Sequence, residues 1–385
     1  MARRADRARE LHVRQAAYLR GRHNMSQSDI GRVLGGFSQA HVSRLLKLAE
    51  AQGYLVTRVQ FVGDDLSEED IAQLERLHEP RPLALALERL ERREGVVAPR
   101  VSVFDSGSRA DSAVAHAGRR RRFGKAAAGR LLELLDGARS VGVTWGSTVA
   151  GLIEGLGSLR FGPGGDEELL VVPVCAELLG LAAPEYSSSR LSVRLDEIVN
   201  RAPRERFSLA GVPAYIPDRY GREKVAAIRE FVADAASYKA IFGGQEPLAE
   251  RLDGLLTSVG SSEQPIGGGT AELLAAGRID ANTLRSLIVG DIGGALIARE
   301  SLTPDERARV DELNAMWTGI SLEHIRGIAR RGIARDTPGC VVVAVGSERA
   351  SVAFEVVRRG LVNEMLIDQD LAQALERLVE RHLAR

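Results

Sequence analysis

The chain has 385 residues, of which 44% are hydrophobic and 27% charged, and its 52 Lys and Arg balance 52 Asp and Glu. This length predicts two or three domains, and the composition excludes a mainly disordered chain. No apolar run approaches the roughly 20 residues of a membrane helix. The two cysteines, Cys175 and Cys340, form neither a zinc motif nor a disulfide framework. We expect a soluble, cytoplasmic protein that uses no metal, no cofactor and no membrane partner.

The balanced total charge hides an asymmetry along the chain. Residues 1–60 contain 11 Lys and Arg against 4 Asp and Glu, whereas the remaining residues contain 41 against 48. A basic N-terminal segment on an acidic body predicts that a polyanion binds at one end of the chain.

The N-terminal segment has the pattern of a helix-turn-helix. Residues 5–22 are compatible with one helix, and Ser26 opens a capping box for a second helix over residues 27–34. Gly35-Gly36 ends this second helix, and Ser38 caps a third. The residues that we expect the second helix to bury are Ile30, Val33 and Leu34.

The third helix carries the expected DNA contacts. Its apolar residues recur with helical spacing at Val42, Leu45, Leu46 and Ala49, so its opposite face is polar and basic. A helix of this kind fits the major groove, where Gln39, Ser43 and Arg44 reach base edges. Lys47 is placed to neutralise a phosphate. The alternating residues 54–61 predict a wing strand. The alternative is a small helical domain whose basic face binds nothing.

Three regions follow from the pattern along the chain. Residues 1–62 form the predicted winged helix-turn-helix domain, and residues 63–95 form a helical connector that packs on the body or forms a dimer seam. From residue 96 to residue 385, short apolar runs alternate with helical segments, which predicts an α/β domain with a parallel sheet. We interpret the arginine run 119–122 as the solvated start of a helix over 124–136, rather than as an anion-steering patch.

A strand-to-helix junction at 141–153 is the clearest candidate for a ligand site. An apolar strand runs into Gly146, Ser147 and Thr148, and a helix with apolar periodicity follows. Free backbone N–H groups at the helix start and two hydroxyls at the carboxyl end of a sheet can cradle a phosphate. The junction is neither a Walker loop nor the dinucleotide fingerprint. A mere helix cap is the alternative.

Three further apolar runs end in polar residues. Residues 255–259 lead into Gly260 and Ser261, residues 286–290 into Asp291, and residues 340–345 into Gly346, Ser347 and Arg349. Ligands bind at the carboxyl ends of strands in open α/β sheets, so these termini together predict a sugar-phosphate pocket. Singly, each has an ordinary alternative. Asp291 caps a helix, Arg349 pairs with Glu348 or Glu355, and Ser261 belongs to a loop.

In order and spacing, these pieces resemble the SorC family of bacterial sugar-binding transcriptional regulators over nearly the full length of the chain. The matching pieces are Ser26–Gly31, Ser38–Lys47, Val141–Thr148, Val289–Gly294, Val343–Arg349 and Arg359–Asn363. The resemblance implies a Rossmann-like effector domain with the fold shared by ribose-5-phosphate isomerase and glucosamine-6-phosphate deaminase. It also implies a small phosphorylated sugar as effector, and homodimers or homotetramers on a bipartite DNA operator.

The resemblance also assigns residues to the effector site. The family's phosphate-holding turn falls on Gly146, Ser147 and Thr148, its glycine-rich strand end on Gly260 and Ser261, and its acidic turn on Asp291. Two departures stand out. The stretch 259–263 lacks the usual Gly-Ile-Gly. Arg349, beside Gly346 and Ser347, replaces a lysine, so a planar guanidinium with several N–H donors stands in place of a compact ammonium group. An unphosphorylated sugar or polyol therefore remains an alternative effector.

A carbohydrate-controlled transcription factor is the leading hypothesis, with repression of a catabolic operon relieved by the ligand. The first alternative is a sugar-phosphate isomerase or deaminase, for which Glu263, Asp291 and His324 are candidate acids and bases. No tight catalytic constellation is evident, and an enzyme would not explain the basic N-terminal segment, so we expect no catalytic residue. The second alternative is a constitutive DNA-binding protein with a degenerate pocket.

Overall fold

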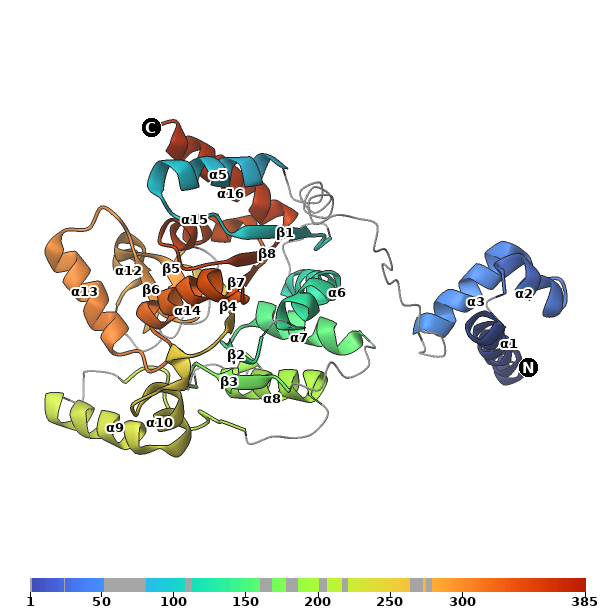
Figure 1. The fold of residues 1–385 in the computed structure, drawn as a ribbon, viewed down its shortest axis with the longest axis horizontal. Coiled ribbons are helices and arrows are strands. Elements are labelled where there is room, and N and C mark those ends of the chain that lie inside the picture. Colours follow the sequence, from blue (N-terminus) through green and yellow to red (C-terminus); the bar gives the residue numbers. More distant parts are fainter. Residues whose placement is uncertain are drawn as a thin grey trace. The chain divides into compact units, whose positions relative to one another are not determined.

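The computed structural model describes residues 2–23, 25–51, 81–107, 113–136, 138–159, 168–177, 186–200, 206–216, 221–263, 273–274 and 279–385 (Figure 1). The chain divides into two compact units, Met1–Ile71 and Ala72–Arg385, called here the head and the body. The predicted wing strand 54–61 lies outside the described residues.

The described part of the head consists of α1 (Ala2–His23), α2 (Gln27–Val33) and α3 (Gln39–Ala51). The Ser26 hydroxyl caps α2 by accepting the Asp29 N–H at 3.2 Å, and it donates to the Asp29 carboxylate at 2.6 Å. Gly35 and Gly36 make the turn with φ angles of 96° and 86°, which glycine adopts without strain. The Ser38 hydroxyl then accepts the His41 N–H at 3.3 Å at the start of α3. The predicted helix-turn-helix is thus present.

One apolar cluster holds the head together, with members from all three helices: Val13, Ala16, Ala17, Ile30, Val42, Leu45, Leu46 and Ala49. The expected burial of Val33 is wrong, because its side chain is 59% exposed, and Leu34 is only half-buried. The reason lies in Gly31, where a side chain would overlap the Phe37 carbonyl of the turn. The buried face of α2 is therefore centred on Ile30 and Gly31, and Val33 lies about 160° around the helix from Gly31.

The body is built on a mainly parallel sheet with the strand order β1-β8-β7-β4-β2-β3 among the described residues. The strands are β1 (Arg100–Phe104), β2 (Ser140–Val143), β3 (Leu170–Pro173), β4 (Gly254–Ser261), β5 (Ile288–Ile292), β6 (Ala295–Ala298), β7 (Gly339–Ala344) and β8 (Glu364–Asp368). The predicted α/β class is confirmed. Residues 141–143 and 340–344 lie in strands of the parallel sheet, as expected.

One strand prediction needs correction. Residues 286–287 belong to α12 (Ala281–Leu287), and β5 pairs antiparallel with the end of β4 and with β6. Asp291 therefore follows no parallel strand and caps no helix; it lies within β5, before the hairpin turn at Gly293-Gly294. A short, fully apolar run reads the same in a parallel and in an antiparallel ladder, so the sequence pattern could not tell the two apart.

Helices cover both faces of the sheet. Besides α12, the described helices of the body are α5 (Arg81–Glu94), α6 (Ala113–Asp136), α7 (Ser147–Ser158), α8 (Ser188–Val199), α9 (Arg222–Asp234), α10 (Ala236–Phe242), α13 (Pro304–Ala315), α14 (Leu322–Arg335), α15 (Ala350–Arg358), α16 (Gln369–Leu383), and the 3-10 turns η3 (Leu248–Glu250) and η4 (Ser347–Arg349). Successive side chains of β7 point to opposite faces of the sheet and so belong to two different parts of the core. Val341 and Val343 pack with α6, α7 and α8, whereas Val342 packs with α14, α15 and α16.

The interpretation of the arginine run 119–122 as a solvated helix start needs correction. Helix α6 begins at Ala113, so the run lies inside the helix and not at its start. Arg121 and Arg122 are exposed, as expected, but Arg119 is only 4% exposed. Arg119 is instead part of the interior of the body.

Helix α5, the described part of the predicted connector, packs on the body. Leu83, Leu87 and Leu90 are buried in its core, and α5 lies beside α16 (Figure 1), whereas Leu85 is 54% exposed. Helix α5 thus contributes to the core that α16 helps to close.

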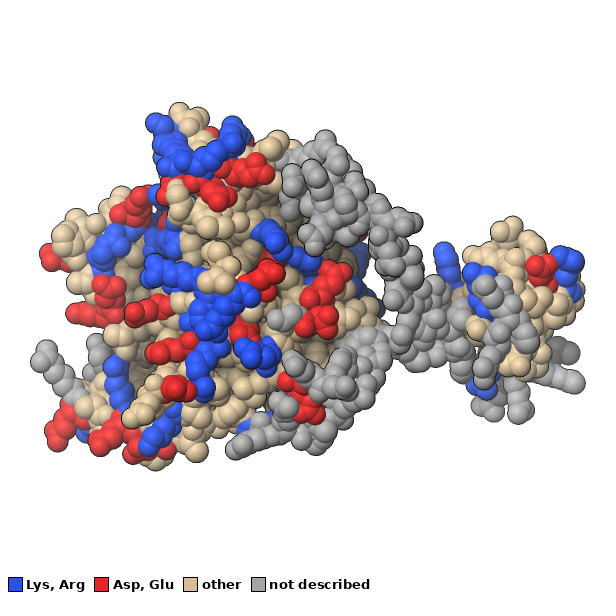
Figure 2. All heavy atoms as spheres, viewed as in Figure 1, with Lys and Arg blue, Asp and Glu red and all other residues tan. Residues whose placement is uncertain are grey.

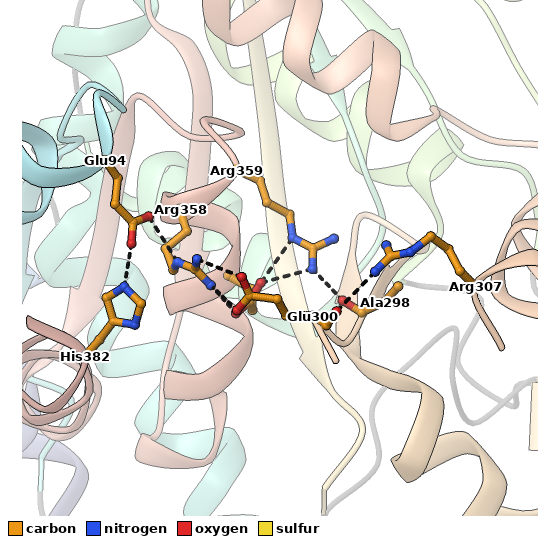
Figure 3. Close-up of polar contacts among 8 residues, drawn as sticks. Glu94, Ala298, Glu300, Arg307, Arg358, Arg359 and His382 are labelled. Carbon is orange, nitrogen blue, oxygen red and sulfur yellow. Dashed lines mark hydrogen bonds and ion pairs between the residues drawn. The ribbon is translucent and has the colours of Figure 1, made fainter. Parts of the chain in front are cut away.

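An ion-pair network anchors the end of α5 (Figure 3). The Glu94 carboxylate accepts from Arg358 Nε at 3.1 Å and bonds the His382 ring, and Arg358 also holds both Glu300 oxygens, at 2.9 and 3.2 Å. The hydrogen bonds to Glu300 raise the pKa of Arg358 above its ordinary value. The network joins α5, α15, α16 and the turn after β6.

Acidic and basic side chains are interleaved over the face of the body that Figure 2 shows. Among the described helices, none is long and apolar enough to cross a membrane.

Candidate functional site

The predicted DNA-contacting residues share one face of α3. Gln39, Arg44 and Lys47 are exposed and Ser43 is half-buried, while the apolar positions of the same helix close the head core. The Arg44 guanidinium donates to the Ala40 carbonyl of its own helix at 3.3 Å. The face therefore presents an amide, a hydroxyl and two cations, which are the groups that read base edges and bind phosphates.

The strand-to-helix junction after β2 has the predicted geometry. Gly146 turns the chain with φ of 133°, and a Cβ there would lie 2.8 Å from the Ser258 hydroxyl oxygen of β4. The turn thus requires glycine, and a side chain there would also displace the Ser258 hydroxyl. The Gly146 N–H is occupied, because it donates to the Tyr186 carbonyl at 3.2 Å. No described side chain caps α7, and Thr148 in its first turn is 5% exposed.

A second junction, after β7, repeats this arrangement. Gly346 has φ of 105°, and its N–H donates to Asp368 Oδ1 at 3.0 Å. The turn η4 follows, and it places Arg349 with its guanidinium on the Glu348 carboxylate and on the Val345 carbonyl. Of the alternatives for Arg349, the pairing with Glu348 is present, but the pair is half-buried and not on a solvated face.

The two junctions enclose a cavity of about 240 Å³. It is lined by His116, Arg119, Arg120, Thr148, Val345, Gly346, Glu348 and Arg349. The structure thus brings together three of the predicted effector residues, Thr148, Gly346 and Arg349. Gly146, Ser147 and Ser347 belong to the same two turns but are not among the described lining residues.

Sequence reasoning missed the side of the cavity that α6 supplies. Arg119 reaches Asp368 at 2.6 Å, Asp370 at 2.7 Å and the Ser106 hydroxyl at 3.0 Å. Asp368 is fully buried and also accepts the Gly346 N–H, so it ties α6 to the β7 junction. The signal is the arginine run 119–122 itself, for which an anion-steering patch is the alternative to a solvated helix start.

Asp291, Gly260 and Ser261 form a separate polar cluster where β4 pairs with β5. Asp291 is 5% exposed, and its Oδ1 accepts the Gly294 N–H at 3.1 Å, whereas Oδ2 has no partner among the described residues. A side chain on Gly260 would overlap this carboxylate. Burial raises the pKa of Asp291 to about 6, against the lowering effects of the Gly294 hydrogen bond and of the Arg349 charge. Ser261 accepts the Glu263 N–H at 3.1 Å.

The candidate acids and bases of the enzyme alternative lie in different surroundings. His324 takes part in the capping box of α14, where Ser321 donates its N–H to Nδ1 at 3.3 Å, and burial lowers the pKa of this histidine. Glu263 is exposed, and Asp291 lies in β5. Among the described residues, no group of three His, Cys, Asp or Glu is arranged to hold a metal ion.

Solved structures of regulators share this fold. The full-length sorbitol operon regulator SorC of Klebsiella pneumoniae is similar with a TM-score of 0.60 and 17% identity, over 94% of this chain and 97% of its own. The chain has the fold of SorC-type regulators. The probable sor operon regulator of Shigella flexneri aligns with a TM-score of 0.51 and 17% identity, over 76% of this chain and 98% of its own. A domain of a possible sugar-binding transcriptional regulator from Arthrobacter aurescens aligns with a TM-score of 0.51 and 18% identity, over 76% and 97%.

No protein-family profile and no curated protein matches the sequence. The expectation of a SorC-type fold, drawn from a few short motifs, is thus confirmed by the three-dimensional comparison.

Proposed function

We propose that the protein is a DNA-binding transcriptional regulator whose affinity for its operator is controlled by a small carbohydrate effector, a phosphorylated sugar or polyol. The head binds double-stranded operator DNA through α3, and the effector occupies the cavity between the β2 and β7 junctions of the body. The protein acts as a homodimer or homotetramer on paired half-sites, and the effector relieves repression of a carbohydrate catabolic operon.

The observation that carries this proposal is the presence of two different binding chemistries in two separate compact units of one chain. The head offers an exposed basic helix face, and the body offers a cavity lined by three arginines and a buried threonine at the carboxyl ends of parallel strands. The second arrangement suits a ligand with an anionic end and hydroxyl groups. A catalyst alone would need no DNA-reading face.

Two single substitutions test the assignment of roles. Arg44→Ala should reduce the selection of duplexes from a random double-stranded pool by about tenfold or more, because one good base contact contributes roughly 1–3 kcal/mol. It should leave intact the thermal stabilisation of the body in a screen of sugar phosphates, free sugars and polyols. Thr148→Ala should do the reverse.

The screen needs ligand well above its dissociation constant, since about 100 times that value adds roughly 2.7 kcal/mol to the apparent stability. Arg92→Ala, an exposed arginine of α5, is the control for loss of positive charge. Full ligand stabilisation of Thr148→Ala would show that the effector binds elsewhere. Unchanged DNA selection by Arg44→Ala would remove Arg44 from the interface.

A further inference from the structure

Helices α6 and α7 meet backbone to backbone, and this contact sets one wall of the cavity. A Cβ on Gly124 would lie 2.9 Å from the Leu152 N and closer still to the Gly151 carbonyl, and a Cβ on Gly155 would lie 2.7 Å from the Lys125 N. Only glycine permits such an approach. Arg120 stands one helical turn before Gly124, so the contact brings it to the first turn of α7, where Thr148 lies.

The three arginines of the cavity differ in how their charges are balanced. Arg119 is held by Asp368 and Asp370, and Arg349 is held by Glu348. Arg120 is half-buried, and among the described residues no carboxylate pairs with it and no acceptor bonds its guanidinium. Burial lowers the pKa of Arg120; the Tyr186 side chain opposes this effect, and the positive charge of Arg349 adds to it. One positive charge therefore faces the cavity without a counter-ion from the described part of the chain.

We propose that Arg120 is the residue that selects an anionic effector, by binding its phosphate or carboxylate group through a charge-assisted pair of hydrogen bonds. The inference rests on the proposed function and names a determinant of specificity within that site. A planar guanidinium presents two parallel N–H groups that match two oxygens of such an anion. The anion lies between Arg120 and the first turn of α7, whose N–H groups no described side chain caps.

The balance of charge also explains why Arg120, rather than Arg349, discriminates between ligands. Glu348 already neutralises Arg349, so a neutral sugar could lie beside that pair without leaving a charge unpaired. A neutral ligand beside Arg120 would take water from a guanidinium and give no charge in return, which is unfavourable. Selectivity for an anion therefore resides on α6.

The test uses the full chain, inorganic phosphate as probe, and chloride of matched ionic strength as reference. Phosphate should bind and thermally stabilise the wild type, and Arg120→Gln should weaken this binding about tenfold or more. Arg120→Lys, which keeps the charge but not the two parallel N–H groups, should retain part of the affinity. Arg121→Gln is the matched control, because Arg121 is the next residue of α6, is 66% exposed and pairs with Glu154.

A purely structural role for Arg120 predicts a different result. If the residue only supported the fold, Arg120→Gln would melt below the wild type in chloride. Since the charge of Arg349 acts on Arg120 and no described carboxylate pairs with it, we expect the variant to melt at or above the wild type.

Binding within twofold of the wild type in Arg120→Gln would overturn the inference, as would an equal loss in Arg121→Gln or an absence of phosphate binding by the wild type. Loss of binding in Thr148→Ala alone would keep the cavity as the effector site and reject Arg120. DNA selection by the same proteins reports on the proposed function separately. Its absence in the wild type would reject the regulator assignment and leave the result for Arg120 standing.

Discussion

Asp291 shows how a single buried side chain makes stability depend on pH. The β5 strand holds it between Gly260 and the Gly294 N–H, with one carboxylate oxygen unpartnered among the described residues. Burial raises the pKa of Asp291 to about 6 from an ordinary value of 3.8. The folded state therefore binds a proton more tightly than the unfolded state does. The resulting stability is fully present below about pH 4 and is lost as the pH rises through 6.

We predict that Asp291→Asn is more stable than the wild type at pH 8, by up to about 3 kcal/mol, because the amide need not ionise. Near pH 4 the two proteins should have similar free energies of unfolding. The amide oxygen can still accept the Gly294 N–H. Urea denaturation between pH 4 and pH 8 measures the difference.

An exposed carboxylate provides the control for Asp291. Asp311→Asn on α13 removes a negative charge from the surface and should leave the slope of stability against pH close to that of the wild type. If the slope of Asp291→Asn matched the wild-type slope as well, Asp291 would be ionised in the folded protein at no cost.

Among the elements, the pair α6 and α7 connects packing to the cavity. We predict that Gly124→Ala lowers the stability of the body by about 1–3 kcal/mol, since the new methyl group would collide with the backbone of α7 at Gly151 and Leu152. Relief of the collision moves α6 away from α7 and carries Arg120 with it. Phosphate binding should therefore weaken together with stability, as read by denaturation and by titration of the same sample.

Gly129 on the same helix is the matched control. A Cβ there would meet no heavy atom within 4 Å, so Gly129→Ala should stabilise the protein by roughly 0.5–1 kcal/mol through helix propensity alone. If Gly124→Ala behaved like Gly129→Ala, the backbone contact between the helices would not position Arg120.

Elements whose local signals agreed were predictable from sequence. The cap at Ser38, the turn glycines 35 and 36 and the periodicity of α3 all indicate the same helix, and the structure has it. The β2 and β7 junctions are predictable because each places a glycine two or three residues after a buried strand. Three of the nine predicted effector residues line the cavity. The sequence pattern thus indicates the two turns at its edge but not the side chains that α6 contributes to its lining.

The rest could not be predicted because the deciding contacts are distant in sequence. Arg119 is buried through Asp368, 249 positions away, and a hydrophobic pattern assigns an arginine to the surface. Helix α6 starts at Ala113, eleven residues before the predicted start, where the sequence has no apolar spacing that would indicate a helix. The antiparallel pairing of β5 depends on the length of β4, which runs beyond the parallel sheet.

At the scale of the whole molecule, the proposed DNA-binding face and the proposed effector cavity belong to separate compact units. A ligand in the cavity can change the affinity of α3 for DNA only if it binds two states of the protein with different affinity. A coupling of about 1–3 kcal/mol would change operator affinity some 5–150-fold. The proposed function thus requires a linkage that holds in both directions.

Reciprocity gives the last prediction. If the stabilising ligand of the screen weakens binding of a selected duplex by a given factor, the duplex must weaken ligand binding by the same factor. Titrating the wild type with each partner in the presence and absence of the other measures both factors. Thr148→Ala should bind the duplex with wild-type affinity but show no ligand effect.

Unequal factors would indicate that the ligand also binds outside the body or binds DNA itself. A factor of one in both directions would identify a constitutive DNA-binding protein, because a cavity that fills without changing DNA affinity regulates nothing.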